Sequence, residues 1–172
     1  ENVLQTAVKM INSLSNELNI MRPQMLQGGL QVVAHNNNRK NYNLRLFEFG
    51  KTYSTGPDNN YTETNHLSFY SSGNITDQDW STKAVKSDYF YLKGVVENSL
   101  SILGITRAIF EPANVNGFQN YTEVKINNKA IAFLGEVDEA TMKQFDLKVP
   151  VFYADILWDE LLTLAKEKQI QY

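Results

Sequence analysis

The sequence contains no cysteine, only two histidines and no long hydrophobic run. Without cysteine, disulfide bonds, thiolate zinc sites and cysteine nucleophiles are excluded, and an intracellular setting fits. No apolar run approaches the roughly eighteen residues that a membrane-spanning helix needs, so no membrane association is expected.

Reactive groups are equally sparse. Neither His35 nor His66 has a partner at metal-site spacing such as H-E-x-x-H, so they are expected at a helix end and a strand edge. No histidine lies near Ser13 or Ser15 to activate them, and the glycines lack the context of a phosphate-binding loop. The sequence therefore predicts no catalytic, cofactor-binding or metal-binding residue in this chain.

What is present indicates a folded domain. The chain has 172 residues, of which 42% are hydrophobic, so it can bury a sizeable core. A net charge of −3 and a pI near 5.4 argue against a dominant nucleic-acid-binding surface. Residues 1–56 nevertheless carry six Lys/Arg against three Asp/Glu, whereas the remainder carries ten against sixteen. This mildly basic third is suited to RNA or to an acidic protein partner.

The stretch from Met21 to Gly50 organises the rest. Pro23 suits a first helical turn, because its φ is fixed and its missing N–H costs nothing there. Apolar residues then recur at helical spacing and end in a run of asparagines, which favour non-helical backbone; they are Leu26, Leu30, Val33 and Ala34. Gly28 and Gly29 inside this helix cost about 1 kcal/mol each relative to alanine, so we expect close approach of another backbone.

A strand follows at residues 45–50 and is predicted to be apolar on both faces except for Glu48. A buried carboxylate is costly unless it finds a donor, and Arg22, Arg39 and Arg45 are the candidates. Glu48 could contact a ligand, but the favoured interpretation is an ion pair that joins the strand to the helix.

The remaining elements alternate between hairpins and helices. Strands are predicted at 44–54 and 66–72 with a long mobile tip between them, at 105–111, at 121–126 and 129–137 around two asparagines, and at 151–155. Helices are predicted from Asp88 to Gly104, after Asp138, and over 158–168. Residues 1–12 fit either a helix or a strand, and Trp80 is expected to be the apolar anchor of residues 73–86. Asp155 is interpreted as a negative charge near the start of the last helix, where it would complement the helix dipole. This order predicts an α+β fold with a mainly antiparallel sheet flanked by helices.

One succession of motifs resembles the beta subunit of bacterial phenylalanyl-tRNA synthetase, in its catalytic-core-like module. The matching elements are Leu14-Ser15, Met21-Arg22, Leu26, Gly29-Leu30, Asn36, Arg39 and 46–50, followed by 90–97, 130–136 and 145–147. Ser13 departs from a usual proline and Ala132 from a common glycine. Because the chain starts at Glu1 without a leader, residues 1–172 are expected to be one domain excised from a longer polypeptide.

The resemblance implies a class II synthetase-like fold that is degenerate and does not form aminoacyl-adenylate. Catalysis would belong to the alpha subunit, which this module would help to hold in an α2β2 assembly. The complete cytoplasmic complex would use ATP and magnesium to join phenylalanine to tRNA(Phe). The candidate subunit-contact or structural residues are Arg22, Gly28, Gly29, Asn36, Arg39 and Glu48.

Two alternatives stay open. The first is an RNA-binding module that stacks bases on an aromatic sheet, for which the candidates are Tyr42, Phe47, Phe49, Tyr53, Phe69 and Tyr70. The second is a free-standing enzyme with a pocket that the sequence does not reveal.

Overall fold

A six-stranded antiparallel sheet forms the centre of the computed structural model, which describes residues 6–11, 19–56, 58 and 60–167. Its strands lie in the order β1 (Leu44–Thr55), β2 (Tyr61–Ser72), β8 (Val151–Leu157), β7 (Lys129–Val137), β6 (Phe118–Ile126) and β5 (Ile109–Pro112). Every neighbouring pair in this sheet is antiparallel. The predicted α+β class is therefore confirmed.

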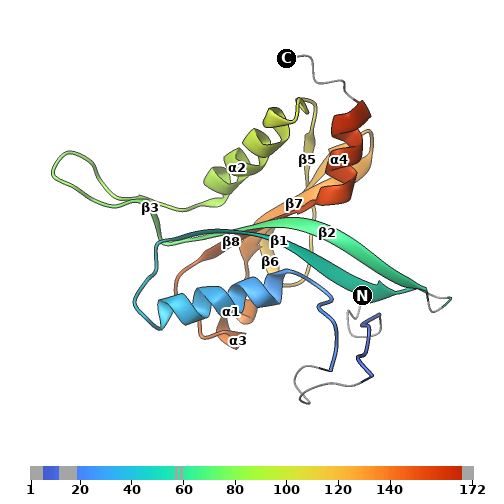
Figure 1. Cartoon of the computed structure of the whole chain (residues 1–172). Coiled ribbons are helices and arrows are strands. Elements are labelled where there is room, and N and C mark those ends of the chain that lie inside the picture. Colours follow the sequence, from blue (N-terminus) through green and yellow to red (C-terminus); the bar gives the residue numbers. More distant parts are fainter. Residues whose placement is uncertain (1–5, 12–18, 57, 59, 168–172) are drawn as a thin grey trace.

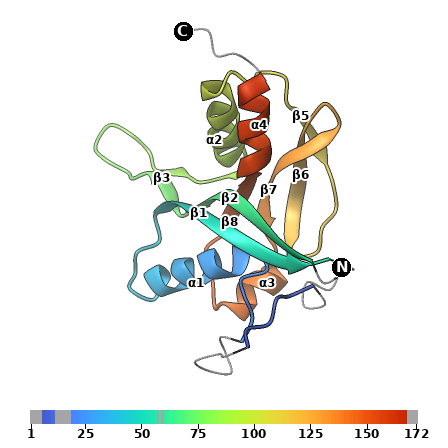
Figure 2. The ribbon, with the colours of Figure 1, turned by 45° about the vertical axis from the view of Figure 1, so that its right-hand side comes forward.

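Helices cover both faces of the sheet (Figures 1 and 2). The helices α1 (Leu26–Asn37) and α3 (Glu139–Gln144) lie on one side, which we name the α1/α3 face. The helices α2 (Tyr89–Ile102) and α4 (Trp158–Glu167) lie on the other, the α2/α4 face. None of the described helices is long and apolar enough to cross a membrane.

Each face has its own core, and β8 supplies both of them. Because side chains alternate along a strand, Phe152, Ala154 and Ile156 pack toward α2 and α4. Val151 and Tyr153 pack toward α1. A strand buried on both faces reads as a continuous apolar run, and this explains the central position of β8.

Local sequence signals set several element ends as predicted. The Asp88 carboxylate accepts a 2.7 Å hydrogen bond from the Tyr91 N–H at the start of α2, and Gly104 follows α2 with a φ of +73°. Asp138 caps α3 in the same way through the Thr141 N–H, also at 2.7 Å. Asn127 and Asn128 adopt φ values of 50° and 62° and close the β6–β7 hairpin.

Other boundaries differ from the predictions. Helix α1 begins at Leu26, three residues after Pro23, and the tip between β1 and β2 is short because Thr55 pairs with Tyr61. Strand β5 covers only the end of the predicted 105–111 segment and reaches Pro112. Residues 6–11 make isolated strand bridges, at Ala7 and Lys9, so this part is extended rather than helical. The motif residues Ser13, Leu14 and Ser15 lie outside the described residues.

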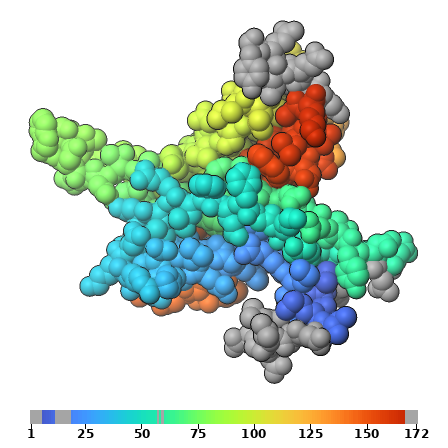
Figure 3. Space-filling view, in the orientation of Figure 1, coloured from blue at the N-terminus to red at the C-terminus, as the bar shows by residue number. Residues whose placement is uncertain are grey.

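The segment between β2 and α2 projects from the body of the molecule (Figure 3). It carries the two-stranded sheet of β3 (Asn74–Thr76) and β4 (Val85–Lys86). Trp80 belongs to the loop that joins these two strands, and its side chain is 99% exposed, so its predicted anchoring role is wrong. No residue of the extension belongs to either core cluster.

Candidate functional site

A buried polar array crosses three strands on the α1/α3 face. The Asp155 side chain on β8 accepts hydrogen bonds of 2.8 Å from both His66 Nδ1 and the Ser68 hydroxyl on β2. The other imidazole nitrogen, His66 Nε2, lies 2.8 Å from Thr52 Oγ1 on β1. In the tautomer whose Nδ1–H donates to Asp155, Nε2 accepts a hydrogen bond from the Thr52 hydroxyl.

Strand register brings these residues together. Ser68 stands directly opposite Asp155, and His66 is two residues along β2 on the same face. Asp155 is only 2% exposed and does not lie at a helix start, while His66 is buried in the middle of β2. The predicted positions of both residues, at a helix start and at a strand edge, are therefore wrong.

Five aromatic rings form a wall beside this array. They make successive contacts with centroid distances between 5.0 and 6.1 Å, and they are Tyr70, Phe118, Tyr121, Phe133 and Tyr153. We name this set the aromatic wall. Burial, with the nearby charges of Glu123 and Asp155, raises the pKa of Tyr121 to about 12. Burial also raises the pKa of Tyr70 and of Tyr153 above that of a free tyrosine.

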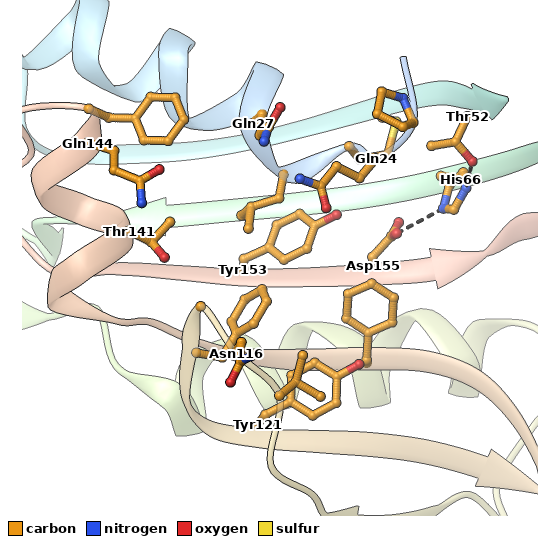
Figure 4. A pocket seen from close by; sticks show the side chains of 18 of the residues that line it. Gln24, Gln27, Thr52, His66, Asn116, Tyr121, Thr141, Gln144, Tyr153 and Asp155 are labelled. Atoms are coloured by element: carbon orange, nitrogen blue, oxygen red, sulfur yellow. Dashed lines mark hydrogen bonds and ion pairs between the residues drawn. The ribbon is translucent and has the colours of Figure 1, made fainter. Parts of the chain in front are cut away.

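The array and the wall enclose a cavity of about 760 Å³, shown in Figure 4. Thr52, His66 and Asp155 lie at one end of it, and Thr141 and Gln144 lie at the other. The start of α1, α3 and the loop before β6 complete the lining. The exposed residues Gln27, Asn116 and Gln144 are also part of the lining and mark its mouth.

The cavity has an unbalanced charge. Asp155 is its acidic lining residue, and its lining contains neither lysine nor arginine. In the part of the chain that the structure describes, no three His, Asp or Glu side chains gather as a metal site. The chemistry that this lining supports is recognition of a neutral or positively charged group.

The ion pair expected for Glu48 is present. Arg22 Nη1 lies 2.5 Å from Glu48 Oε1, and both side chains are more than one third exposed. Of the other candidate donors, Arg39 hydrogen-bonds to His35 and Arg45 donates to the Ile75 carbonyl. The prediction of an ion pair between strand and helix region is therefore confirmed, with Arg22 as the partner.

Two phenylalanine side chains on the outer side of β1 are more exposed than the sequence predicts. Phe47 is 68% exposed and Phe49 is 57% exposed, so β1 is not apolar and buried on both faces. β1 is an edge strand. The Phe49 ring packs edge-to-face on Trp158 at the start of α4, with centroids 5.0 Å apart, but it stays more than half exposed.

The glycine pair in α1 does serve packing. A Cβ atom at Gly29 would lie 2.0 Å from Tyr70 Cε1, so it is an aromatic ring, not another backbone, that approaches closely. The Tyr70 hydroxyl donates to the Met25 carbonyl at 2.9 Å and fixes that ring. At Gly28 the added atom would lie 3.1 Å from Arg22 Nη2.

The six predicted residues thus divide into two groups. Arg22, Gly28, Gly29 and Glu48 gather around the start of α1, whereas Asn36 and Arg39 lie at its far end. In α1 the Asn36 amide donates to the Val32 carbonyl at 2.9 Å. Sequence reasoning missed the array of Thr52, His66 and Asp155. A carboxylate inside the apolar run VFYADIL is the same signal that drew attention to Glu48.

The family model for the phenylalanyl-tRNA synthetase beta-chain CLM domain matches residues 1–158. This chain belongs to that family. The CLM-domain assignment is supported by the phenylalanine–tRNA ligase beta subunits of Bacteroides thetaiotaomicron, 34% identical over 96% of this chain, and of Porphyromonas gingivalis, 33% identical over 97%. The chain spans 22% of the length of each of these relatives.

Solved structures support the fold of this CLM domain. The crystal structure of pyrrolysyl-tRNA synthetase from Desulfitobacterium hafniense superposes with a TM-score of 0.74 at 12% identity. The match covers 98% of this chain and 56% of that one. The class II synthetase-like architecture expected from the sequence is therefore confirmed.

Proposed function

We propose that this chain is a non-catalytic module of a phenylalanyl-tRNA synthetase beta subunit, with residues 1–172 as one domain of a longer polypeptide. The observation that carries the proposal is the lining of the cavity, which has an acid but no lysine or arginine. A nucleotide triphosphate is normally held by cationic side chains and metal ions. A cavity lined by a carboxylate and by no lysine or arginine is poorly suited to hold it.

In the complete complex, the alpha subunit would carry the catalytic site, and this module would support an α2β2 assembly. That complex would work in the cytoplasm and would use ATP and magnesium to attach phenylalanine to tRNA(Phe). Calorimetric titration of the isolated chain with ATP and magnesium should give no heat of binding. Saturable ATP binding that is lost on substitution of cavity residues would overturn the non-catalytic assignment.

The outward side of α1 is our candidate for the subunit contact. Gly29, Leu30 and Val33 face the sheet and are buried. Val32 and Arg39 are exposed, and Gly28 and Asn36 are partly buried. Val32 is 49% exposed, an apolar group on a surface that could be covered by a partner. The predicted contact role of Gly29 would be indirect, through the position of α1.

Co-purification with the alpha subunit tests this surface. Val32→Asp should weaken association, because the contact would then bury an unpaired charge. Asn98→Asp, which introduces the same charge at an exposed position of α2, is the matched control. Equal association of both variants would remove α1 from the interface. Gly29→Leu is unsuitable here, since it would displace Tyr70 inside the domain.

A second function is favoured by the outer side of β1. Alternation along this strand places Arg45, Phe47, Phe49 and Lys51 on one side, with the two rings exposed between two cations. Exposed aromatic and basic side chains are suited to stacking and backbone contacts with single-stranded RNA. This function predicts tRNA affinity that falls steeply with salt and that weakens in Phe47→Ala. Affinity that is absent, or unchanged by salt, would rule it out.

A further inference from the structure

The cavity on the α1/α3 face has the features of a binding site that the proposed scaffold role does not use. Its volume of about 760 Å³ lies within the roughly 300–1,000 Å³ of small-molecule sites. The apolar body of a ligand would contact the aromatic wall, of which Phe118, Tyr121, Phe133 and Tyr153 line the cavity.

The polar end of the cavity selects the charge of that ligand. Asp155 accepts one hydrogen bond from His66 and one from Ser68, and the Tyr153 hydroxyl also interacts with this carboxylate. An ionised carboxylate can accept about four, so Asp155 retains capacity for a further donor. A carboxylate that is 98% buried is also costly to desolvate unless it is compensated by a positive charge.

The lining contains no lysine or arginine, so His66 is the only lining residue that could bring a positive charge to Asp155. His66 is the one basic group at this end, and its Nδ1 already binds Asp155. Aromatic faces add attraction for a cation through their negative π-surfaces. A ligand that carries an ammonium group would therefore donate a hydrogen bond to Asp155 and pack against the aromatic wall at the same time.

We propose that this cavity binds a small organic amine, an apolar or aromatic body that ends in a protonated amino group and carries no carboxylate. The ammonium group would donate to Asp155, and the body would lie along Tyr121, Phe133 and Tyr153. A ligand carboxylate would be disfavoured, because the lining offers no cation to pair with it. This proposal does not depend on the subunit role and can fail independently of it.

The test titrates the full 172-residue chain with three probes of similar size. Binding is measured by NMR from the signals of the aromatic rings. They are 2-phenylethylamine, 2-phenylethanol and phenylalanine. The amine should bind at least about tenfold more tightly than the alcohol, because a charged donor forms the stronger hydrogen bond to a carboxylate. Phenylalanine, which adds a carboxylate, should bind more weakly than the amine. Equal affinities for amine and alcohol, or no binding of the amine, would overturn the proposal.

Two variants locate the site. Asp155→Asn should remove the preference for the amine over the alcohol, and Tyr121→Leu should weaken both probes. Asp146→Asn changes an exposed acid outside the cavity and is the matched control. If Asp155→Asn does not fold, the probe comparison on the wild type together with Tyr121→Leu decides. Binding of the amine that Tyr121→Leu leaves unchanged would place it elsewhere and refute the proposal.

Discussion

The two faces of the central sheet are built on different principles. The α2/α4 face is filled with aliphatic side chains, of which Val96, Ile131 and Leu134 have no exposed surface. The α1/α3 face instead combines aromatic rings, a buried acid and a cavity of about 760 Å³. The α2/α4 face can therefore provide most of the packing energy while the α1/α3 face retains a cavity. Because neighbouring residues of one strand point to opposite faces, substitutions within a single strand can compare the two faces.

The largest contrast is expected within β7. Leu134 points into the filled core, so Leu134→Ala should lower the free energy of unfolding by about 2–5 kcal/mol. Phe133 lines the cavity, and Phe133→Leu should cost less than about 1.5 kcal/mol because the change is absorbed beside open space. Urea denaturation of both variants gives these values. Equal losses would show that the two faces are packed alike.

Glycines in the two main helices give the next contrast. In α1, Gly29→Ala should cost about 1–3 kcal/mol, because the methyl group would overlap the Tyr70 ring. In α2, nothing lies within 4 Å of the Cβ position at Gly94. Gly94→Ala should therefore raise stability by about 0.5–1 kcal/mol. Thermal unfolding of the pair tests this, and a stabilising Gly29→Ala would contradict the described α1–β2 packing.

The aromatic wall should make the domain sensitive to alkali. The pKa of Tyr121 is raised from 10.0 to about 12, so above pH 10 the unfolded chain loses this proton before the folded one does. The free energy of unfolding should fall between pH 10 and about 12, most steeply while the folded tyrosine stays protonated. In Tyr121→Phe this fall should be shallower. Denaturation curves across that range decide, and an unchanged slope would exclude Tyr121 as a cause.

The smallest contrast concerns the helix caps. Asp88→Ala removes the bond to the Tyr91 N–H and should cost about 1 kcal/mol of global stability, since α2 packs on the filled core. Asp138→Ala removes the equivalent bond in α3, a helix with no buried residue. Its effect should be mainly local fraying, visible as faster amide hydrogen exchange in α3. Global losses of the same size would show that α3 is an integral part of the fold.

The sequence predicted the elements better than their contacts. Caps such as Asp88 and Asp138, and the turn at Asn127, act within a few residues and can be recognised locally. The exposure of Phe47 and Phe49 could not be predicted, because it depends on β1 being an edge strand. The predicted anchoring role of Trp80 is wrong for a related reason. Such a role needs a neighbouring surface for the ring to pack on, and this side chain is 99% exposed.

The candidate site was less predictable than the fold. His66 lies 89 positions from Asp155 and 14 positions from Thr52 in the sequence, and only strand register brings these residues within hydrogen-bond distance. No local spacing can reveal such a cluster. By contrast, the sequence does predict a cationic partner for Glu48 among Arg22, Arg39 and Arg45, because a carboxylate in an apolar strand needs a nearby donor.

The position of β8 has a consequence for synthesis on the ribosome. This strand is the last of the sheet to be translated, yet it lies between β2 and β7. Until residue 157 leaves the exit tunnel, the β1–β2 hairpin and the β6–β7 hairpin each present an open strand edge to other nascent chains. Completion of the sheet is therefore a late, post-emergence event, and chaperones would meet two half-sheets before they meet a domain.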